Sequence, residues 1–165
     1  KQLLRGAKEA TTEYIAVAED DTLYCQDHFE YRPEKGVFAY NQSHWSLFTW
    51  GEPMYSWRDR IGNYTLIAHR EDVIEALEER FTKYPNGTPE GKTGEIGRWR
   101  TDTQLGLTPR KVEEFKTNTP VINLVHQLGL DERASRQRKS HGTLRAYEIP
   151  TWGRAEDLLK HYETI

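Results

Sequence analysis

Apolar and polar side chains alternate along much of the first 70 residues. Between positions 22 and 31, Leu23, Phe29 and Tyr31 fall on one face of an extended chain, and mostly polar side chains fall on the other. A turn sequence, RPEKG at 32–36, follows and is typical of a hairpin loop. The pattern therefore predicts an antiparallel meander with strands at Tyr14–Ala18, Thr22–Tyr31, Val37–Tyr40, His44–Trp50 and Asn63–Ala68, and a loop over Gly51–Gly62.

The period of the pattern changes at residue 70. Val73, Ile74, Leu77 and Phe81 recur at intervals of three and four residues, which predicts a helix over Arg70–Tyr84 with one apolar face. We expect this helix to pack on the meander and to complete an N-terminal domain that spans residues 1–84.

Glycine and proline then interrupt the chain. Residues 85–97, PNGTPEGKTGEIG, contain four glycines and two prolines, a composition typical of a linker. We therefore place a boundary here and assign residues 98–165 to a second domain.

Two short helix patterns follow in tandem in this second domain. Each opens with a Thr-Pro pair, at 108–109 and at 119–120, in which the threonine caps exposed amides and proline occupies the first helical position. The second pattern ends at Gly129, a residue suited to a left-handed C-cap. Its apolar stripe consists of Val121, Ile122, Leu124, Val125 and Leu128.

A basic stretch, a turn at 139–142 and a strand-like run at Thr143–Ile149 come next. Two helices in tandem, followed by a hairpin with a basic tip, resemble a winged helix-turn-helix domain. Most members of that superfamily bind DNA, although some serve as protein-docking modules. The expected fold class is thus α+β: an N-terminal antiparallel sheet with a packed helix, then a C-terminal winged helix-turn-helix.

The resemblance implies how double-stranded DNA would be bound. The second helix would present Asn123, His126 and Gln127 to base edges, since asparagine and glutamine pair naturally with adenine. Cationic side chains around it would contact phosphates. This set consists of Arg110 and Lys111 in the preceding helix, Arg133, Arg136, Arg138, Lys139 and His141 in the wing, and Arg145 in the following strand.

The distribution of charge agrees with an anionic partner for one part of the chain. The whole chain has a net charge of −3, whereas residues 1–91 carry 10 Lys and Arg against 16 Asp and Glu, and residues 92–145 carry 11 against 6. The basic part favours nucleic acid, although a solvated basic face is the alternative. The acidic part is expected to form a homodimer or to contact a protein partner.

The sequence also permits an enzyme. Asp27, His28 and His44 are candidates for an acid–base or metal-dependent nuclease centre. Cys25 and His28, with His44, fall short of the four ligands of a structural zinc site, so we expect no metal. No phosphate-binding glycine loop is present, and we expect no cofactor.

Aromatic residues are concentrated in the first half, with 12 of the 19 lying between residues 14 and 64. Such rings on strands are either stacking platforms for single-stranded nucleic acid or core, and we favour core because that half is acidic.

With one cysteine and no apolar run as long as a membrane span, we expect an intracellular, cytoplasmic protein. The hypothesis is double-stranded DNA binding by a transcriptional regulator or a plasmid or viral replication accessory. The alternatives are a nucleic-acid-processing enzyme with a catalytic N-terminal domain and a protein-interaction module.

Overall fold

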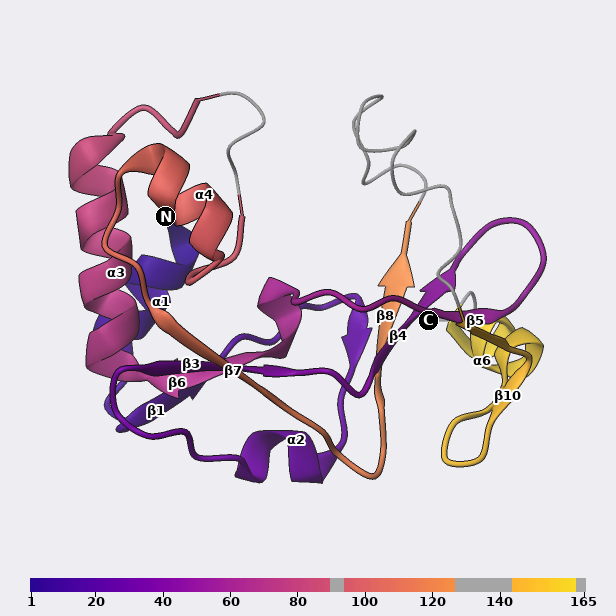
Figure 1. Ribbon diagram of the computed structural model, residues 1–165. Coiled ribbons are helices and arrows are strands. Elements are labelled where there is room, and N and C mark those ends of the chain that lie inside the picture. The colour runs from indigo at the N-terminus through magenta and orange to yellow at the C-terminus, as the bar shows by residue number, and fades with distance from the viewer. Residues whose placement is uncertain (90–93, 127–143, 163–165) are drawn as a thin grey trace.

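The computed structural model describes residues 1–89, 94–126 and 144–162, and confirms an α+β fold. Two larger sheets form two lobes (Figure 1), and β10 and β11 pair in a separate two-stranded sheet. Sheet A has four strands in the order β1-β6-β3-β7, and sheet B has five in the order β2-β8-β4-β5-β9. Helices α1, α3 and α4 lie with the first lobe, and α6 lies with the second (Figure 1).

The elements have the following bounds. The helices are α1 (Gln2–Glu9), α2 (Gln26–Glu30), α3 (Arg70–Lys83), α4 (Trp99–Leu105) and α6 (Ala155–Tyr162), with a 3₁₀ turn η1 (Asn63–Thr65). The strands are β1 (Tyr14–Ala16), β2 (Thr22–Leu23), β3 (Val37–Asn41), β4 (His44–Phe48), β5 (Tyr55–Trp57), β6 (Leu66–His69), β7 (Lys111–Phe115), β8 (Val121–Val125), β9 (Leu144–Ala146), β10 (Glu148–Ile149) and β11 (Gly153–Arg154).

Two long chain segments cross from one sheet to the other. The first runs from β3 into β4, and the second from β7 into β8. They lie parallel, with β3 paired to β7 in sheet A and β4 paired to β8 in sheet B. Hydrogen bonds from Gln42 N to Phe115 O and from Val121 N to Ser43 O, each 2.8 Å, continue the pairing at the bend. The two sheets are therefore joined by a double connection.

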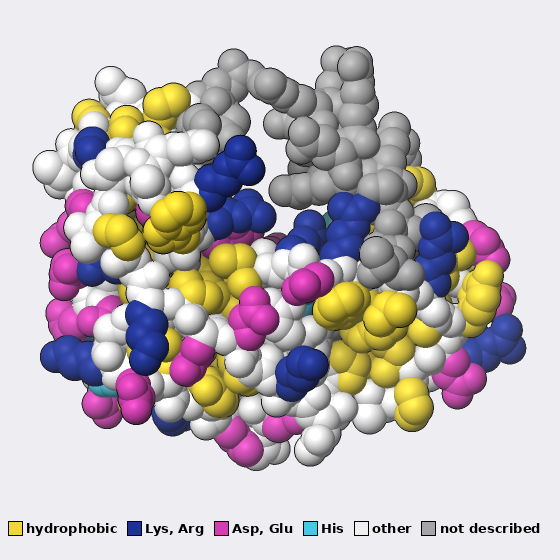
Figure 2. Space-filling model, viewed as in Figure 1, with side chains coloured by type: hydrophobic (Ala, Val, Ile, Leu, Met, Phe, Trp, Pro, Cys, Tyr) yellow, Lys and Arg dark blue, Asp and Glu magenta, His cyan; other side chains and the backbone are white. Residues whose placement is uncertain are grey.

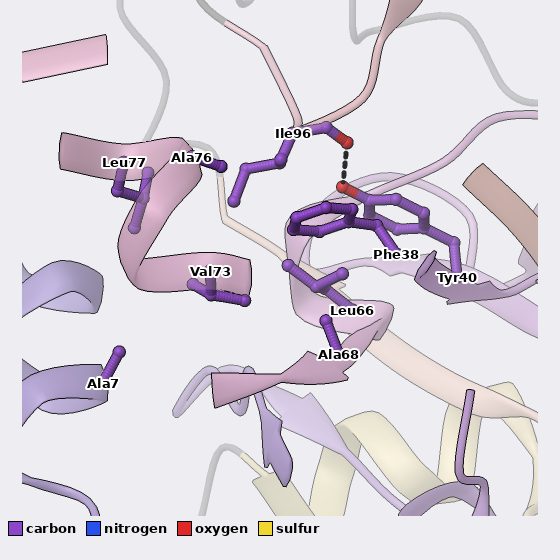
Figure 3. Packing of buried hydrophobic residues seen from close by; sticks show 9 residues of the cluster. All are labelled: Ala7, Phe38, Tyr40, Leu66, Ala68, Val73, Ala76, Leu77 and Ile96. Carbon is purple, nitrogen blue, oxygen red and sulfur yellow. Dashed lines mark hydrogen bonds between the residues drawn. The ribbon is translucent and has the colours of Figure 1, made fainter. Parts of the chain in front are cut away.

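The core of the first lobe lies between sheet A and its helices. Phe38, Tyr40 and Leu66 project from the strands toward Val73 and Leu77 of α3 (Figure 3). The Tyr40 hydroxyl donates a 2.7 Å hydrogen bond to the carbonyl of Ile96, which satisfies its only buried polar group. This bond attaches the segment before α4 to the strand beneath it.

The core of the second lobe lies between sheet B and α6. Leu47, Tyr55 and Leu124 pack from three neighbouring strands against Ala155 and Leu159. The predicted aromatic core is confirmed at Phe38, Tyr40 and Tyr55, each at most 1% exposed.

The predicted tandem helices are wrong, because residues 111–115 and 121–125 form β7 and β8. The first four residues of β8 are buried because β2 and β4 flank the strand and both faces of sheet B are covered there. A strand buried on both faces is a continuous apolar run, and over five residues such a run also fits the spacing of a helix. No described part of the chain forms the tandem helices of a winged helix.

Most predicted elements of the first 84 residues are confirmed, with four corrections. The strand expected over Asn63–Ala68 begins at Leu66, because Asn63–Thr65 form the 3₁₀ turn η1. The strand expected over 22–31 ends at Leu23, and α2 takes its second part. Residues 51–62, predicted as a loop, contain β5. The sheets are mixed and not antiparallel, since β7 and β8 enter them in parallel.

The boundary placed at 85–97 does not separate the sheets. Strands from residues 1–84 and from residues 98–165 pair with each other in both. Helix α3 (Arg70–Lys83) matches its predicted range, Arg70–Tyr84, to within one residue. Within the described ranges, no helix combines the length and apolar character that a membrane span requires.

Candidate functional site

A row of polar side chains crosses sheet B from edge to edge. Asn123 of β8 is in register with Thr22 on one side and Ser46 on the other, Ser46 with Ser56, and Ser56 with Arg145. Every strand of the sheet therefore contributes one polar residue. Thr22, Ser46, Ser56 and Asn123 are each at most 9% exposed. Buried polar side chains in this number are unusual for a sheet face, because each needs a hydrogen-bond partner.

A pocket of about 280 Å³ adjoins this row. Asn123 and Val125 of β8 line it together with His126, the residue that follows the strand, and Glu19 and Asp21 line it from the segment before β2. Its other lining residues are Arg60, Ile61, Gly62, Asn63, Tyr64, Glu95 and Leu124. The pocket thus combines carboxylates, an arginine, a histidine and two carboxamides, and its lining suits a polar ligand with several hydrogen-bonding groups.

Hydrogen bonds fix the side chains from β8. The Asn123 carboxamide donates to Thr22 Oγ1 at 3.1 Å and to Asp21 Oδ1 at 3.5 Å. His126 Nε2 lies 3.1 Å from the hydroxyl of Tyr162 in α6. The sequence predicted Asn123 and His126 as neighbours on a helix. The structure also brings them to one site, but from the end of a strand.

A buried histidine, His44, hydrogen-bonds two residues that line the pocket, Arg60 and Tyr64. His44 Nε2 lies 2.8 Å from the carbonyl of Arg60 and therefore donates to it, so Nδ1 accepts from the Tyr64 hydroxyl, also at 2.8 Å. Burial lowers the pKa of His44 to about 4 and raises the pKa of Tyr64. His44 is thus a neutral structural residue at pH 7.

Cationic and aromatic side chains lie at the start of α4, where Arg98 contacts a residue that lines the pocket. Arg98 lies 3.2 Å from the carboxylate of Glu95, which itself lines the pocket. Trp99, the next residue, is 70% exposed, and Arg100 is exposed as well. Figure 2 shows Lys and Arg side chains on both sides of the hollow between the two lobes. We call Arg98, Trp99 and Arg100 the α4 rim.

The predicted catalytic residues do not form one centre. Asp27 in α2 accepts hydrogen bonds from the backbone N–H groups of Asn118 and Thr119, at 3.0 and 3.4 Å. The Cys25 thiol and these N–H groups lower the pKa of Asp27. The ring of His28 is fully buried, its Nδ1 accepts from Asn41 at 3.2 Å, and burial lowers its pKa to about 4. Among described residues there is no cluster of three or more His, Cys, Asp or Glu that would hold a metal.

The residues predicted to bind DNA are dispersed. Arg110 is mostly buried and pairs with Glu75 and Glu79 of α3 at 2.7 and 2.9 Å, so its charge is already matched. Lys111 lies 3.9 Å from Glu34 on the other face of sheet A. Arg145 ends the polar row. Gln127, Arg133, Arg136, Arg138, Lys139 and His141 lie outside the described residues.

Sequence reasoning missed most of the pocket, since only Asn123 and His126 of its lining were predicted as binding residues. Glu19 and Asp21 belong to an acidic run, Glu19–Asp21, placed directly before a strand, and that position was a usable signal. Glu95 had no such signal, because the Tyr40 hydrogen bond to Ile96 brings its segment to the site from far along the chain. Comparison of the chain with protein-family models, curated proteins and solved structures finds no match.

Proposed function

We propose that the protein binds nucleic acid at the α4 rim and in the hollow beside it, with at least one unpaired base stacked on Trp99. The observation that carries the proposal is the tryptophan itself. An indole that is 70% exposed between two arginines contributes little to folding, and stacking on a base would bury it.

Positive charge is the second requirement of strand binding. Arg100, which is exposed, supplies positive charge for a phosphate beside the stacked base, and arginine also stacks on bases. In the sequence, residues 92–145 carry 11 Lys and Arg against 6 Asp and Glu, so the part of the chain that contains α4 has a net positive charge.

The polar row supplies a third requirement of strand binding, which is hydrogen-bonding groups. Its hydroxyl and carboxamide groups are of the kinds that hydrogen-bond base edges and sugars. No described helix takes the role of the recognition helix, since β7 and β8 replace the expected pair. The proposal therefore keeps nucleic acid as the partner and changes the mode from groove reading by a helix to strand binding beside a sheet.

The test is fluorescence anisotropy with labelled single strands of about 12 nucleotides and with the matching duplex, across a salt series. We expect the single strand to bind more tightly than the duplex. Trp99→Ala should weaken strand binding by roughly ten-fold or more, the loss of one stacked base. Arg100→Ala should lower the log–log salt slope by about 0.7.

Lys160→Ala is the matched control, because it removes one positive charge from α6, where Lys160 pairs with Glu156 at 2.6 Å. It should leave both the affinity and the salt slope unchanged. If Trp99→Ala binds strands as tightly as the parent, the stacking site does not exist. If Arg100→Ala has the same log–log salt slope as the parent, the α4 rim does not bind phosphate.

Hydrolysis of the bound strand is a second candidate function. It is favoured by the carboxylates of Glu19, Asp21 and Glu95 and the imidazole of His126, which line a pocket next to the rim. Incubating a labelled strand with the protein, with Mg²⁺ or with chelator, tests it. Loss of cleavage in Asp21→Asn with unchanged binding would support the enzyme, and an intact strand under all conditions would leave a binding protein.

A further inference from the structure

A second pocket, of about 410 Å³, opens at the bend between the sheets. It combines aromatic side chains from sheet B with polar residues from the two bends. The residues that line it are Gln42, Ser43, Trp45, Trp57, Lys116, Thr117, Asn118, Pro120 and Leu144.

Strand register places the aromatic wall on the face opposite to the polar row. Ser46 and Ser56 are a cross-strand pair, and side chains alternate along a strand, so the neighbouring residues Trp45 and Trp57 point to the other face. Trp57 is in turn paired with Leu144, which is 54% exposed. The aromatic wall therefore lies on the face of sheet B opposite to the polar row. It does not belong to the pocket that Asn123 and His126 line.

Gln42 is a buried side chain of this bend that has no hydrogen-bond partner among the described residues. Its neighbours are satisfied: Asn41 donates to His28 and Thr117 and accepts from the Ser43 amide, and the Ser43 hydroxyl accepts from the Thr117 amide. Gln42 is 4% exposed, yet both its Nε2 and its Oε1 lack a hydrogen-bond partner among the described residues. A buried carboxamide left in this state is destabilising, which calls for an explanation.

The neighbouring indole is held against this residue. Trp57 Nε1 donates a 3.1 Å hydrogen bond to the backbone carbonyl of Gln42. The ring is thus fixed beside the backbone of Gln42, and its own polar group is satisfied without a ligand. Together they offer a flat apolar surface and an adjacent donor and acceptor.

We infer that this pocket binds a purine nucleotide, with the base between the indoles and Gln42 pairing with its edge. A carboxamide matches adenine in particular, since its donor and acceptor meet N7 and the N6 amino group together. The exposed Lys116 at the mouth supplies a positive charge for the phosphate. The site is separate from the α4 rim, and the inference does not rest on strand binding there.

The test is isothermal titration calorimetry of the full chain with adenosine monophosphate, adenosine and, for comparison, cytidine monophosphate and glucose. We expect saturable binding of adenosine monophosphate, with a higher affinity than that of cytidine monophosphate or glucose. Gln42→Met keeps the size of the side chain and removes its donor and acceptor. It should weaken adenosine monophosphate by about ten-fold or more, while the melting temperature stays equal or rises because no buried polar group remains unpaired.

Two further variants separate the parts of the site. Lys116→Met should weaken adenosine monophosphate several-fold and leave adenosine unchanged, since only the first carries a phosphate. Trp99→Ala, which alters the α4 rim, should bind the nucleotide as the parent does. Absence of saturation by adenosine monophosphate, equal affinity in Gln42→Met, preferential binding of glucose, or loss of binding in Trp99→Ala would each overturn the inference.

Discussion

Sheets A and B are built from the same two bent segments, but they differ in what they bury. In sheet A, Ala39 is in register with Ile67 on one side and Glu113 on the other, and Ala39 and Ile67 are at most 1% exposed. The corresponding middle row of sheet B contains Asn123, Ser46 and Ser56. One sheet therefore buries hydrocarbon in its middle row, and the other buries hydroxyl and carboxamide groups at nearly the same depth.

The difference has a physical meaning. A buried alkyl side chain stabilises the fold through the area it removes from water, whereas a buried polar side chain at best recovers the hydrogen bonds it had with water. A sheet that needed only stability would use the first kind in both places. Residues that depart from this rule are expected at functional sites, and in sheet B they lie beside the pocket that Asp21, Asn123 and His126 line.

The largest effects are expected from truncating the two cores. Phe38→Ala in sheet A should lower the free energy of unfolding by about 3–5 kcal/mol, and Leu124→Ala in sheet B by about 2–5 kcal/mol, because each leaves a cavity. Both side chains are at most 1% exposed. Since two segments run through both sheets, urea unfolding followed by circular dichroism and by tryptophan fluorescence should show one shared transition in each variant.

A contrary result is easily recognised. If Leu124→Ala loses its fluorescence transition at lower urea while the helical signal keeps the parent midpoint, the lobes unfold separately. The division into residues 1–84 and 98–165 would then describe the stability of the chain better than the sheets do.

Limited proteolysis gives a second test of the double connection. Cleavage at residues 85–97 should leave the two pieces associated, because strands from both pair in each sheet.

Acid should destabilise both lobes through their buried histidines. Burial lowers the pKa of His28 and of His44 to about 4, against about 6.5 in an unfolded chain. Below pH 6.5 the unfolded state therefore binds more protons than the folded state, and stability falls with pH until the folded values are reached. Each histidine should cost roughly 2–3 kcal/mol by pH 4, with little change above pH 7.

Urea midpoints measured between pH 4 and 8 test this expectation. His28→Gln provides the comparison, since its carboxamide can still accept from Asn41 but does not titrate. This variant should lose about half of the slope between pH 4 and 6.5, leaving the part that belongs to His44. A slope equal to that of the parent would mean that His28 is already accessible to protons in the folded state.

The sequence predicted the local elements where one periodicity was unambiguous. Apolar-rich runs on either side of a short turn located β3 and β4, and the spacing of Val73, Ile74 and Leu77 located α3 almost to the residue. At β8 the same reasoning failed, because Val121–Val125 fits both a helix and a strand and the preceding Pro120 suits the start of either. Pairing with β2 and β4, which lie far away along the chain, decides that these residues form a strand.

The candidate site was less predictable for the same reason. Asn123 and His126 were predicted as binding residues from their chemical type, and the structure places both at the pocket. Ser46 and Ser56, however, become members of one row only through the register between β4 and β5. Register depends on the patterns of both paired strands and on the turn that joins them, so neither strand by itself specifies it.

The smallest effect on stability, and the sharpest test of the comparison, is expected from exchanging one residue between the two rows. Ser46→Ala removes a hydroxyl from sheet B and keeps nearly the same volume. It should change the free energy of unfolding by less than about 1 kcal/mol, since a hydrogen bond contributes little net stability. Ala39→Ser places a hydroxyl among the apolar side chains of sheet A and should cost roughly 1–3 kcal/mol if it finds no partner.

The affinity for a single strand should respond in the opposite order. Ser46→Ala should weaken binding of the single strand several-fold. Ala39→Ser should leave that affinity unchanged at a temperature where both variants are folded. Thermal melts and anisotropy titrations of the two proteins give all four values. If Ser46→Ala is the less stable variant and binds as the parent does, the polar row is part of the folding of sheet B and the ligand is held by the α4 rim alone.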